Sequence, residues 1–260
     1  MRTIAFTTQK GGSGKSTLAI DLAVAAMQEG ERVIILDTDR QGTVSHWRQR
    51  RADPEPVVEQ IVDDAKLERL VHLLGGKGFT LAVIDTPATE NAAATAATRV
   101  ADLCLIPVRP SAADIEATLP TLHTIRALHK EFAFVLNQAP ARSYRPTKTA
   151  TALNTRGVLA LPFIVERADH QDALEAGLGV TEFAPNGKAC QEIRALWACV
   201  KGKLDRVALD PVGFPIAAPF HAMVLQSLRL ASLAWMPWLR AEDADDLGGR
   251  NPGDEPSKPG

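Results

Sequence analysis

A glycine-rich stretch with two lysines follows directly after an apolar run near the start of the chain. Residues 2–8 have the composition of a strand, residues 10–17 read KGGSGKST, and a helical pattern begins at Lys15. Consecutive backbone N–H groups of such a loop can converge on phosphate oxygens, and the start of the helix adds the positive end of its dipole. The order of strand, glycine-rich loop and helix therefore predicts a phosphate-binding loop for ATP or GTP.

The residue types in this loop predict a partner for each group of the nucleotide. Lys15 is expected to neutralise the β- and γ-phosphates, the Ser16 hydroxyl to bind Mg²⁺, and Thr17 to contact the α-phosphate. The backbone amides expected to cradle the phosphates are those of Gly11, Gly12, Ser13 and Gly14. A tight turn without a ligand is the alternative interpretation of any single glycine-rich stretch.

Two apolar runs further along the chain end in aspartates. Residues 34–36 precede Asp37 and Asp39, and residues 82–84 precede Asp85. Phosphoryl transfer depends mostly on positioning and electrostatics, and a carboxylate in this place can orient the attacking water. We assign this role to Asp39. Asp37 is expected to be an outer partner of Mg²⁺ or its waters, and Asp85 to hold Mg²⁺ through water. For each aspartate taken alone, a helix N-cap or a turn residue is the alternative.

These motifs together resemble the ParA/MinD family of deviant Walker A ATPases. Gln9 occupies the first glycine position of the usual phosphate loop, and the additional lysine, Lys10, matches the signature lysine of the family. Residues 34–42 resemble the family's apolar run followed by DxDxQG, with Arg40 in place of the usual proline. The resemblance covers roughly residues 1–204. It implies an α/β P-loop NTPase fold, with a mostly parallel twisted sheet and helices on both faces.

The resemblance also implies a working cycle with ATP and Mg²⁺ as cofactors. ATP would close a homodimer in which Lys10 reaches the partner's phosphates, so Lys10, Lys15 and Asp39 form the expected catalytic set. A ParB-like or equivalent cargo adaptor would stimulate hydrolysis. The short distance from Met1 to the loop leaves no room for a helix-turn-helix domain, as in small ParA proteins that segregate plasmids or chromosomes or position cargo. The expected location is the cytoplasm, on the nucleoid.

Asn137 is a candidate for recognition of the base. It follows the apolar run of residues 132–136, at a position where ligands bind open α/β sheets. In the resembled family an asparagine here recognises adenine, which would favour ATP over GTP. A turn-forming asparagine is the alternative. The sequence also has no N-K-x-D motif, which argues against a GTPase.

Basic residues near the end of the domain are candidates for contacts with DNA. Members of the family that bind double-stranded DNA without sequence specificity use scattered basic residues in this region. By this resemblance, the candidates are Arg167, Lys188, Arg194, Lys201 and Lys203. Such contacts reach phosphates and depend strongly on salt. A solvated helix face is the alternative, and the net charge of −2 means that any DNA contact needs a local patch.

Length and composition agree with one α/β domain and an appendage. With 260 residues, of which 45% are hydrophobic, the chain can bury a full core, and we expect an ATPase domain over residues 1–204 and an extension over residues 205–260. Cys104, Cys190 and Cys199 have no metal-like spacing and are expected to be reduced thiols of a cytosolic protein. In the extension, residues 221–239 are apolar and partly helical in pattern, and residues 242–260 are expected to be disordered.

Two other functional classes have to be weighed against partition or cargo positioning. A MinD-like regulator that cycles on the membrane would use the apolar part of the extension as an anchor, but this part lacks a lysine-rich polar face, so a membrane partner is not expected. A metabolic enzyme would need metal-ligand cysteines or a substrate domain, and the sequence shows neither.

The apolar runs alternate with helical patterns, as in a parallel sheet wrapped by helices. Strands are expected over residues 2–8, 32–36, 79–84, 103–107 and 132–136, and residues 57–62 follow the break at residues 53–56 without an assigned element. Helices are expected over residues 15–28, 43–50, 65–74, 91–100 and 111–129, the last of them interrupted by Pro120.

Overall fold

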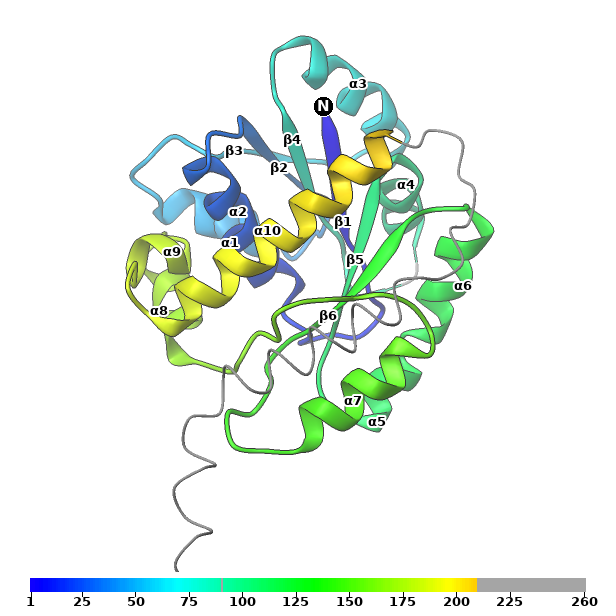
Figure 1. Ribbon diagram of the computed structural model, residues 1–260. Coiled ribbons are helices and arrows are strands. Elements are labelled where there is room, and N and C mark those ends of the chain that lie inside the picture. The colour runs from blue at the N-terminus through cyan, green and yellow to red at the C-terminus, as the bar shows by residue number, and fades with distance from the viewer. Residues whose placement is uncertain (90, 210–260) are drawn as a thin grey trace, which may run out of the picture. The chain divides into compact units, whose positions relative to one another are not determined.

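The computed structural model describes residues 1–89 and 91–209, which form a seven-stranded sheet covered by helices (Figure 1). The strand order is β3-β2-β4-β1-β5-β6-β7, and all neighbouring strands are parallel. The strands are β1 (Arg2–Phe6), β2 (Val33–Asp37), β3 (Val57–Gln60), β4 (Leu81–Asp85), β5 (Leu103–Val108), β6 (Phe132–Leu136) and β7 (Leu159–Ala160). The central strands are short and buried along their whole length, as expected for a parallel sheet with both faces covered.

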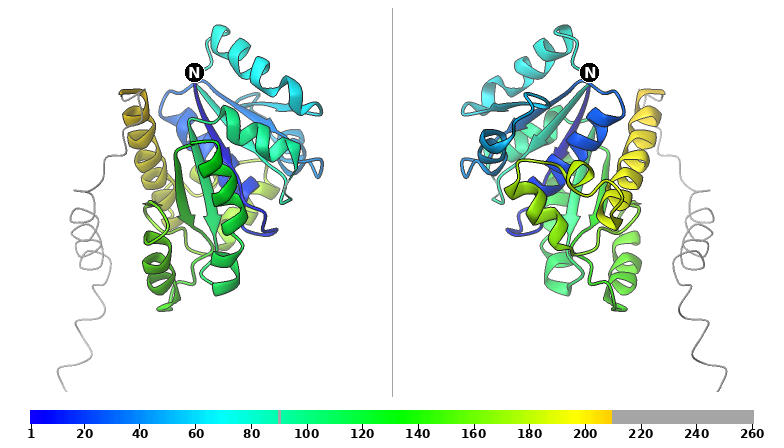
Figure 2. Two further views of the ribbon diagram at one scale, coloured as in Figure 1. Left: turned by 90° about the vertical axis from the view of Figure 1, so that its right-hand side faces the viewer. Right: turned by 90° about the vertical axis from the view of Figure 1, so that its left-hand side faces the viewer.

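Helices cover both faces of the sheet, as the two side views show (Figure 2). One face carries α1 (Lys15–Gln28), α2 (Thr43–Arg50), α8 (Ala168–Glu175), α9 (Val180–Phe183) and α10 (Lys188–Leu209). The other face carries α3 (Leu67–Gly76), α4 (Ala92–Val100), α5 (Ala112–Glu116), α6 (Leu119–Ala127) and α7 (Arg145–Asn154). A short 3₁₀ helix, η1 (Asp64–Lys66), leads into α3.

The sheet divides the hydrophobic core into two layers, and successive side chains of each strand point alternately into one layer and the other. On β1, Ile4 and Phe6 face the layer under α1 and α10, whereas Ala5 faces the layer under α3 to α7. Val83 on β4 faces the first layer and Ile84 the second. Because successive side chains of a strand point to opposite faces, a continuous apolar run supplies both layers at once.

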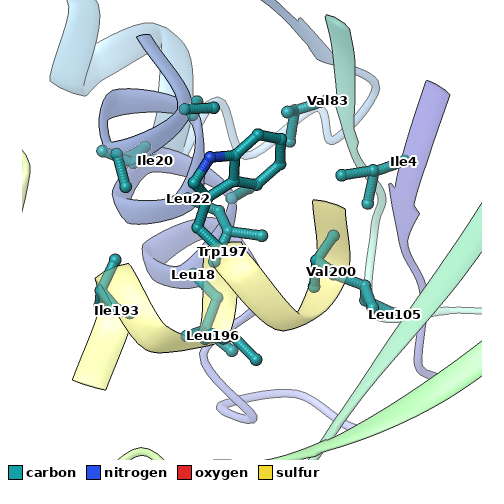
Figure 3. Close-up of a cluster of buried hydrophobic side chains, with 14 of the residues drawn as sticks. Ile4, Leu18, Ile20, Leu22, Val83, Leu105, Ile193, Leu196, Trp197 and Val200 are labelled. Atoms are coloured by element: carbon teal, nitrogen blue, oxygen red, sulfur yellow. The ribbon is translucent and has the colours of Figure 1, made fainter. Parts of the chain in front are cut away.

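Trp197 on α10 is, with Trp47 of α2, one of the largest fully buried side chains of the first layer, and Figure 3 shows it among apolar side chains. It lies with Leu18 and Leu22 of α1, and its indole Nε1 donates a hydrogen bond to the Glu29 carboxylate at 3.0 Å. Burial of an aromatic ring with its N–H satisfied stabilises the contact between the two helices. The helix α10 is therefore fixed against α1, which starts at the phosphate loop.

The structure confirms the predicted fold class, and the sheet of the described residues is wholly parallel. The helix expected over residues 111–129 is interrupted, as predicted, and forms two helices, α5 and α6, but the break lies at Ala117–Thr118 and not at Pro120. Pro120 lies in the first turn of α6, where its missing N–H costs no helical hydrogen bond.

The expected domain boundary after residue 204 falls within α10, which continues to Leu209. Leu204 itself is buried in the first layer of the core. The apolar segment 221–239 and the tail 242–260 lie outside the described residues. In the part of the chain that is described, no helix is both long and apolar enough to cross a lipid bilayer.

Candidate functional site

The carboxyl ends of three central strands meet in one row. Phe6 at the end of β1 pairs in register with Asp85 at the end of β4, and Asp85 pairs with Asp37 at the end of β2. The chain leaves β1 directly into the glycine-rich loop and then into α1. Parallel strands bring all of these ends to one edge of the sheet, which is where open α/β folds bind ligands.

The loop has the backbone geometry that only glycine adopts without strain. Gly12 and Gly14 have φ values of 71° and 85°. At Gly14 there is also no room for a side chain, because a Cβ atom would lie 2.3 Å from Nδ2 of Asn137. The glycine therefore permits both a left-handed turn and the close approach of the end of β6.

Two amides at the end of β6 hold this loop. Asn137 donates a hydrogen bond from Nδ2 to the carbonyl of Ser13 at 2.8 Å, and Gln138 donates one from Nε2 to the carbonyl of Gly12 at 3.2 Å. Asn137 is buried, and its backbone N–H is bonded to the Val108 carbonyl at 2.9 Å. The side chain expected to recognise adenine thus fastens the phosphate loop, and its contact with a base stays a prediction.

Lys15 lies at the base of the loop among carboxylates. Its side chain is buried, and burial lowers the pKa of the ammonium, while the charges of Asp85 and Asp39 act in the opposite direction. A buried cation needs nearby anions to remain charged. This environment suits the predicted role of Lys15, which is to neutralise the phosphates of a bound nucleotide.

Asp85 is fully buried, and neither of its carboxylate oxygens has a hydrogen-bond partner among the described residues. Burial raises its pKa to about 7, and the charges of Asp37 and Asp39 add to the effect. Lys15 opposes the rise, as does the Ser16 hydroxyl, although Ser16 makes no hydrogen bond of normal geometry to it. Unpaired carboxylate oxygens beside a hydroxyl fit Mg²⁺, which prefers oxygen ligands and water.

Asp37 has both oxygens engaged, unlike its neighbour Asp85. One accepts the backbone N–H of Asp39 at 3.1 Å, and the other accepts the backbone N–H and the hydroxyl of Ser45 at 3.0 and 2.7 Å. Asp37 therefore fixes the turn that carries Asp39 and the first turn of α2. An outer role toward Mg²⁺ through water is compatible with these bonds and stays a prediction.

Asp39 projects from this turn and is half-buried. One of its oxygens accepts the backbone N–H of Gln41 at 2.9 Å, and its charge acts on both Lys15 and Asp85. The role of Asp39 in orienting the attacking water is compatible with this position and stays a prediction. Gly42, with φ at 65°, closes the turn before α2.

The remaining loop residues lie around the same edge. Gly11 is exposed, and Ser16 and Thr17 are half-buried in the first turn of α1. The backbone N–H of Lys10 donates to the Thr8 hydroxyl at 3.4 Å. Its half-buried side chain forms no ion pair with any residue of the described ranges. Lys10 thus differs from Lys15, which lies beside two carboxylates.

The motifs do not include Arg109, which the structure brings to the same loop. Its Nη1 atom would lie 3.8 Å from a Cβ placed on Gly12. Nε donates to Asp114 at 2.9 Å, and the Ser111 hydroxyl bonds the same carboxylate. The sequence signal for this arrangement is weak, because RPSAAD shows only a helix N-cap after a strand.

The five basic candidates for DNA contacts do not share one environment. Arg167 is paired with the buried Glu192 at 2.6 Å. The ammonium nitrogen of Lys201 lies 3.7 Å from a carboxylate oxygen of Glu31 and 3.8 Å from one of Glu29. Burial lowers the pKa of the Lys203 ammonium. Lys188 and Arg194 are exposed and form no ion pair with the described residues.

The chain matches the model of one known protein family over residues 4–180, described as the CobQ/CobB/MinD/ParA nucleotide binding domain. The chain belongs to this family. The matched range contains the phosphate loop, the three aspartates and Asn137, so the resemblance to ParA and MinD proteins is confirmed.

Two relatives are similar to this chain over most of their own length. The chain is 30% identical over 209 residues to the maintenance of carboxysome distribution protein A of Gloeobacter kilaueensis, covering 79% of this chain and 94% of that protein. It is 26% identical over 187 residues to the protein ParA of Rhizobium radiobacter, covering 68% and 84% of the two chains.

A solved structure supports the fold assignment independently. The septum site-determining protein MinD of Pyrococcus horikoshii, complexed with Mg-ADP, superposes with a TM-score of 0.64 at 19% identity. The match covers 79% of this chain and 98% of that one. At this identity the similarity is one of fold.

Proposed function

We propose that this chain is a ParA-type ATPase that dimerises with ATP, binds DNA without sequence specificity and thereby segregates DNA or positions a cargo. The observation that carries the proposal is the pair of lysines in the phosphate loop. Lys15 is buried beside Asp85 and Asp39, whereas Lys10 forms no ion pair with the described residues. A second loop cation that forms no ion pair with the described residues of its own subunit is suited to phosphates that are bound in another subunit.

ATP and Mg²⁺ are the proposed cofactors. The amides of Gly11 to Gly14 cradle the phosphates, Lys15 neutralises them, and Thr17 contacts the α-phosphate. Ser16 binds Mg²⁺ and Asp85 holds it through water. Asp37 is an outer partner of Mg²⁺ or of its bound waters. Bound Mg²⁺ neutralises charge on the phosphates as they react. The MinD relative with bound Mg-ADP supports this assignment.

Hydrolysis depends on the position of Asp39. The turn bonded to Asp37 holds this carboxylate at the loop, where it orients the attacking water. Lys10 from the partner completes the charge around the phosphates when the dimer closes. A ParB-like or other adaptor on the cargo completes the catalytic arrangement of the dimer and so stimulates ATP hydrolysis.

The DNA-bound state belongs to the ATP dimer, which places the protein in the cytoplasm on the nucleoid. The name of the ParA relative and the carboxysome relative support partition and cargo positioning, respectively. Duplication of a modest basic surface in a dimer raises its avidity for a polyanion, so a chain with a net charge of −2 can still coat DNA.

A mobility shift with duplex DNA of arbitrary sequence tests the proposal. The protein is assayed without nucleotide, with ADP, and with ATP and Mg²⁺, at low and moderate salt. We expect the wild-type protein to shift the DNA only with ATP and Mg²⁺, and the Lys15→Ala variant not to shift it. Retention that is equal in all nucleotide states would contradict the ATP-dependent cycle, and no retention in any state would remove DNA from the proposal.

A further inference from the structure

A groove is lined by residues of α7, of α5 and of the segment that leads into α5. The helices α5 and α7 directly follow β5 and β6, so they begin at the edge of the sheet that carries the phosphate loop (Figure 1). The volume of the groove is about 360 Å³. The lining residues are Pro110, Ser111, Ala112, Ile115, Arg145, Lys148, Thr149 and Ala152. It contains none of the residues assigned above to nucleotide, Mg²⁺ or DNA.

The two sides of this groove differ in chemistry. Pro110, Ala112 and Ile115 give the α5 side small apolar surfaces, and Arg145 and Lys148 give the α7 side two exposed cations. Neither cation forms an ion pair with any residue in 1–89 or 91–209. The groove therefore offers apolar contact and unneutralised positive charge within one cavity.

The acidic residues of α5 do not neutralise this charge. Asp114 is buried and paired with Arg109 at 2.9 Å. Glu116 is exposed and is not part of the lining. The charge of the cavity is therefore set by Arg145 and Lys148.

A chain of contacts connects the groove to the phosphate loop. Ser111 lines the groove and bonds Asp114, which holds the guanidinium of Arg109. Arg109 in turn lies against Gly12. A ligand that displaces Ser111 would act on the phosphate loop through only two side chains.

We propose that this groove binds a segment of a regulatory partner protein that carries carboxylates next to apolar side chains. Charge complementarity with Arg145 and Lys148 favours an anionic ligand. The concave shape and the apolar α5 side favour a peptide over the backbone of duplex DNA, which offers no apolar side chain to fill the cavity. The binding itself is independent of the proposed function, and only its effect on nucleotide affinity rests on that function.

The test uses the full chain and a fluorescein-labelled peptide of alternating glutamate and leucine, followed by fluorescence anisotropy. Saturable, salt-dependent binding below about 1 mM is expected. Lys148→Glu and Arg145→Glu should each weaken it at least about fivefold. Lys77→Glu, an equal charge change just after α3, is the matched control and should have little effect. Ala152→Met should also weaken binding, because it narrows the groove without a charge change.

Several outcomes would overturn the proposal. They are no saturable binding, equal binding of a lysine–leucine peptide, and an equal loss in Lys77→Glu. Competition by a labelled DNA duplex that also depends on Lys148 would assign the groove to nucleic acid instead.

ADP affinity is measured with and without saturating peptide to test the contact chain. A shift of at least about twofold that is lost in Lys148→Glu is expected. An unchanged ADP affinity would contradict the link to the phosphate loop. If the protein binds no ADP at all, the proposed function fails, while the peptide titration still tests the groove.

Discussion

Asp37 and Asp85 are register partners at the ends of adjacent parallel strands, yet of the two only Asp37 finds hydrogen-bond partners for its carboxylate among the described residues. The difference separates their roles. Asp37 organises the turn that carries Asp39, and the buried Asp85 carboxylate is the one that we propose holds Mg²⁺ through water. Burial of this carboxylate raises its pKa to about 7.

The first prediction concerns stability and pH in the absence of nucleotide and Mg²⁺. The folded state holds a proton on Asp85 up to about pH 7, whereas the unfolded chain releases it near the ordinary value of 3.8. Between these values the folded state binds more protons, so this group lowers the free energy of unfolding as pH rises, by up to about 1.4 kcal/mol per pH unit. Asp85→Asn should remove that slope.

Urea unfolding at several pH values between 4 and 7.5 measures the effect as the difference between wild type and Asp85→Asn. The variant should gain stability relative to wild type as pH rises through this window. A difference that stays constant with pH would show that Asp85 titrates normally.

The second prediction concerns Asn137. Because its amide donates to the carbonyl of Ser13, Asn137→Ala should loosen the phosphate loop and cost about 1 kcal/mol of stability. The affinities for ATP and GTP should fall by similar factors. Isothermal titration with both nucleotides measures this, and a loss confined to ATP would show that the side chain recognises adenine.

The third prediction concerns Asp39. Asp39→Ala should bind ATP with near wild-type affinity but hydrolyse it at least about 100-fold more slowly, because the attacking water loses its orienting base. Phosphate release under single-turnover conditions measures the rate. The turn itself should persist, since Asp37 and Ser45 hold it. Turnover within a factor of two of wild type would remove Asp39 from catalysis.

The fourth prediction separates two of the basic residues expected to contact DNA. Arg194→Glu should weaken DNA binding with no loss of stability, because Arg194 is exposed and makes no ion pair with described residues. Arg167→Glu should instead cost a few kcal/mol of stability, because it places a second carboxylate beside the buried Glu192. Thermal unfolding and the mobility shift distinguish the two, and equal effects of both changes would contradict this assignment.

The sequence predicted most of the fold because the strands are continuous apolar runs and the helices are amphipathic. Residues 15–28 and 43–50 form helices with the expected bounds. It also located the phosphate loop and the aspartates, since parallel strands must bring their carboxyl ends to one edge. The structure adds that these residues lie around Lys15.

Tertiary contacts account for what the sequence could not predict. The bond from Asn137 to Ser13 joins residues far apart in the chain, and Arg109 reaches Gly12 only because β1 and β5 are neighbours. The ion pair of Arg167 with Glu192 likewise depends on how α10 lies against the strand layer. The positions of basic residues in the sequence do not show which of them form ion pairs with acidic residues in the folded chain.

The most direct test of the account is the mass of the protein in solution, measured by light scattering with ADP and with a non-hydrolysable ATP analogue and Mg²⁺. Wild type and the control Lys77→Ala should be monomers with ADP and dimers with the analogue. Lys10→Ala should bind the analogue equally well and remain a monomer. A dimer that forms in Lys10→Ala would contradict the role of Lys10 across the interface, and a wild type that ignores the analogue would contradict the ATP-dependent cycle.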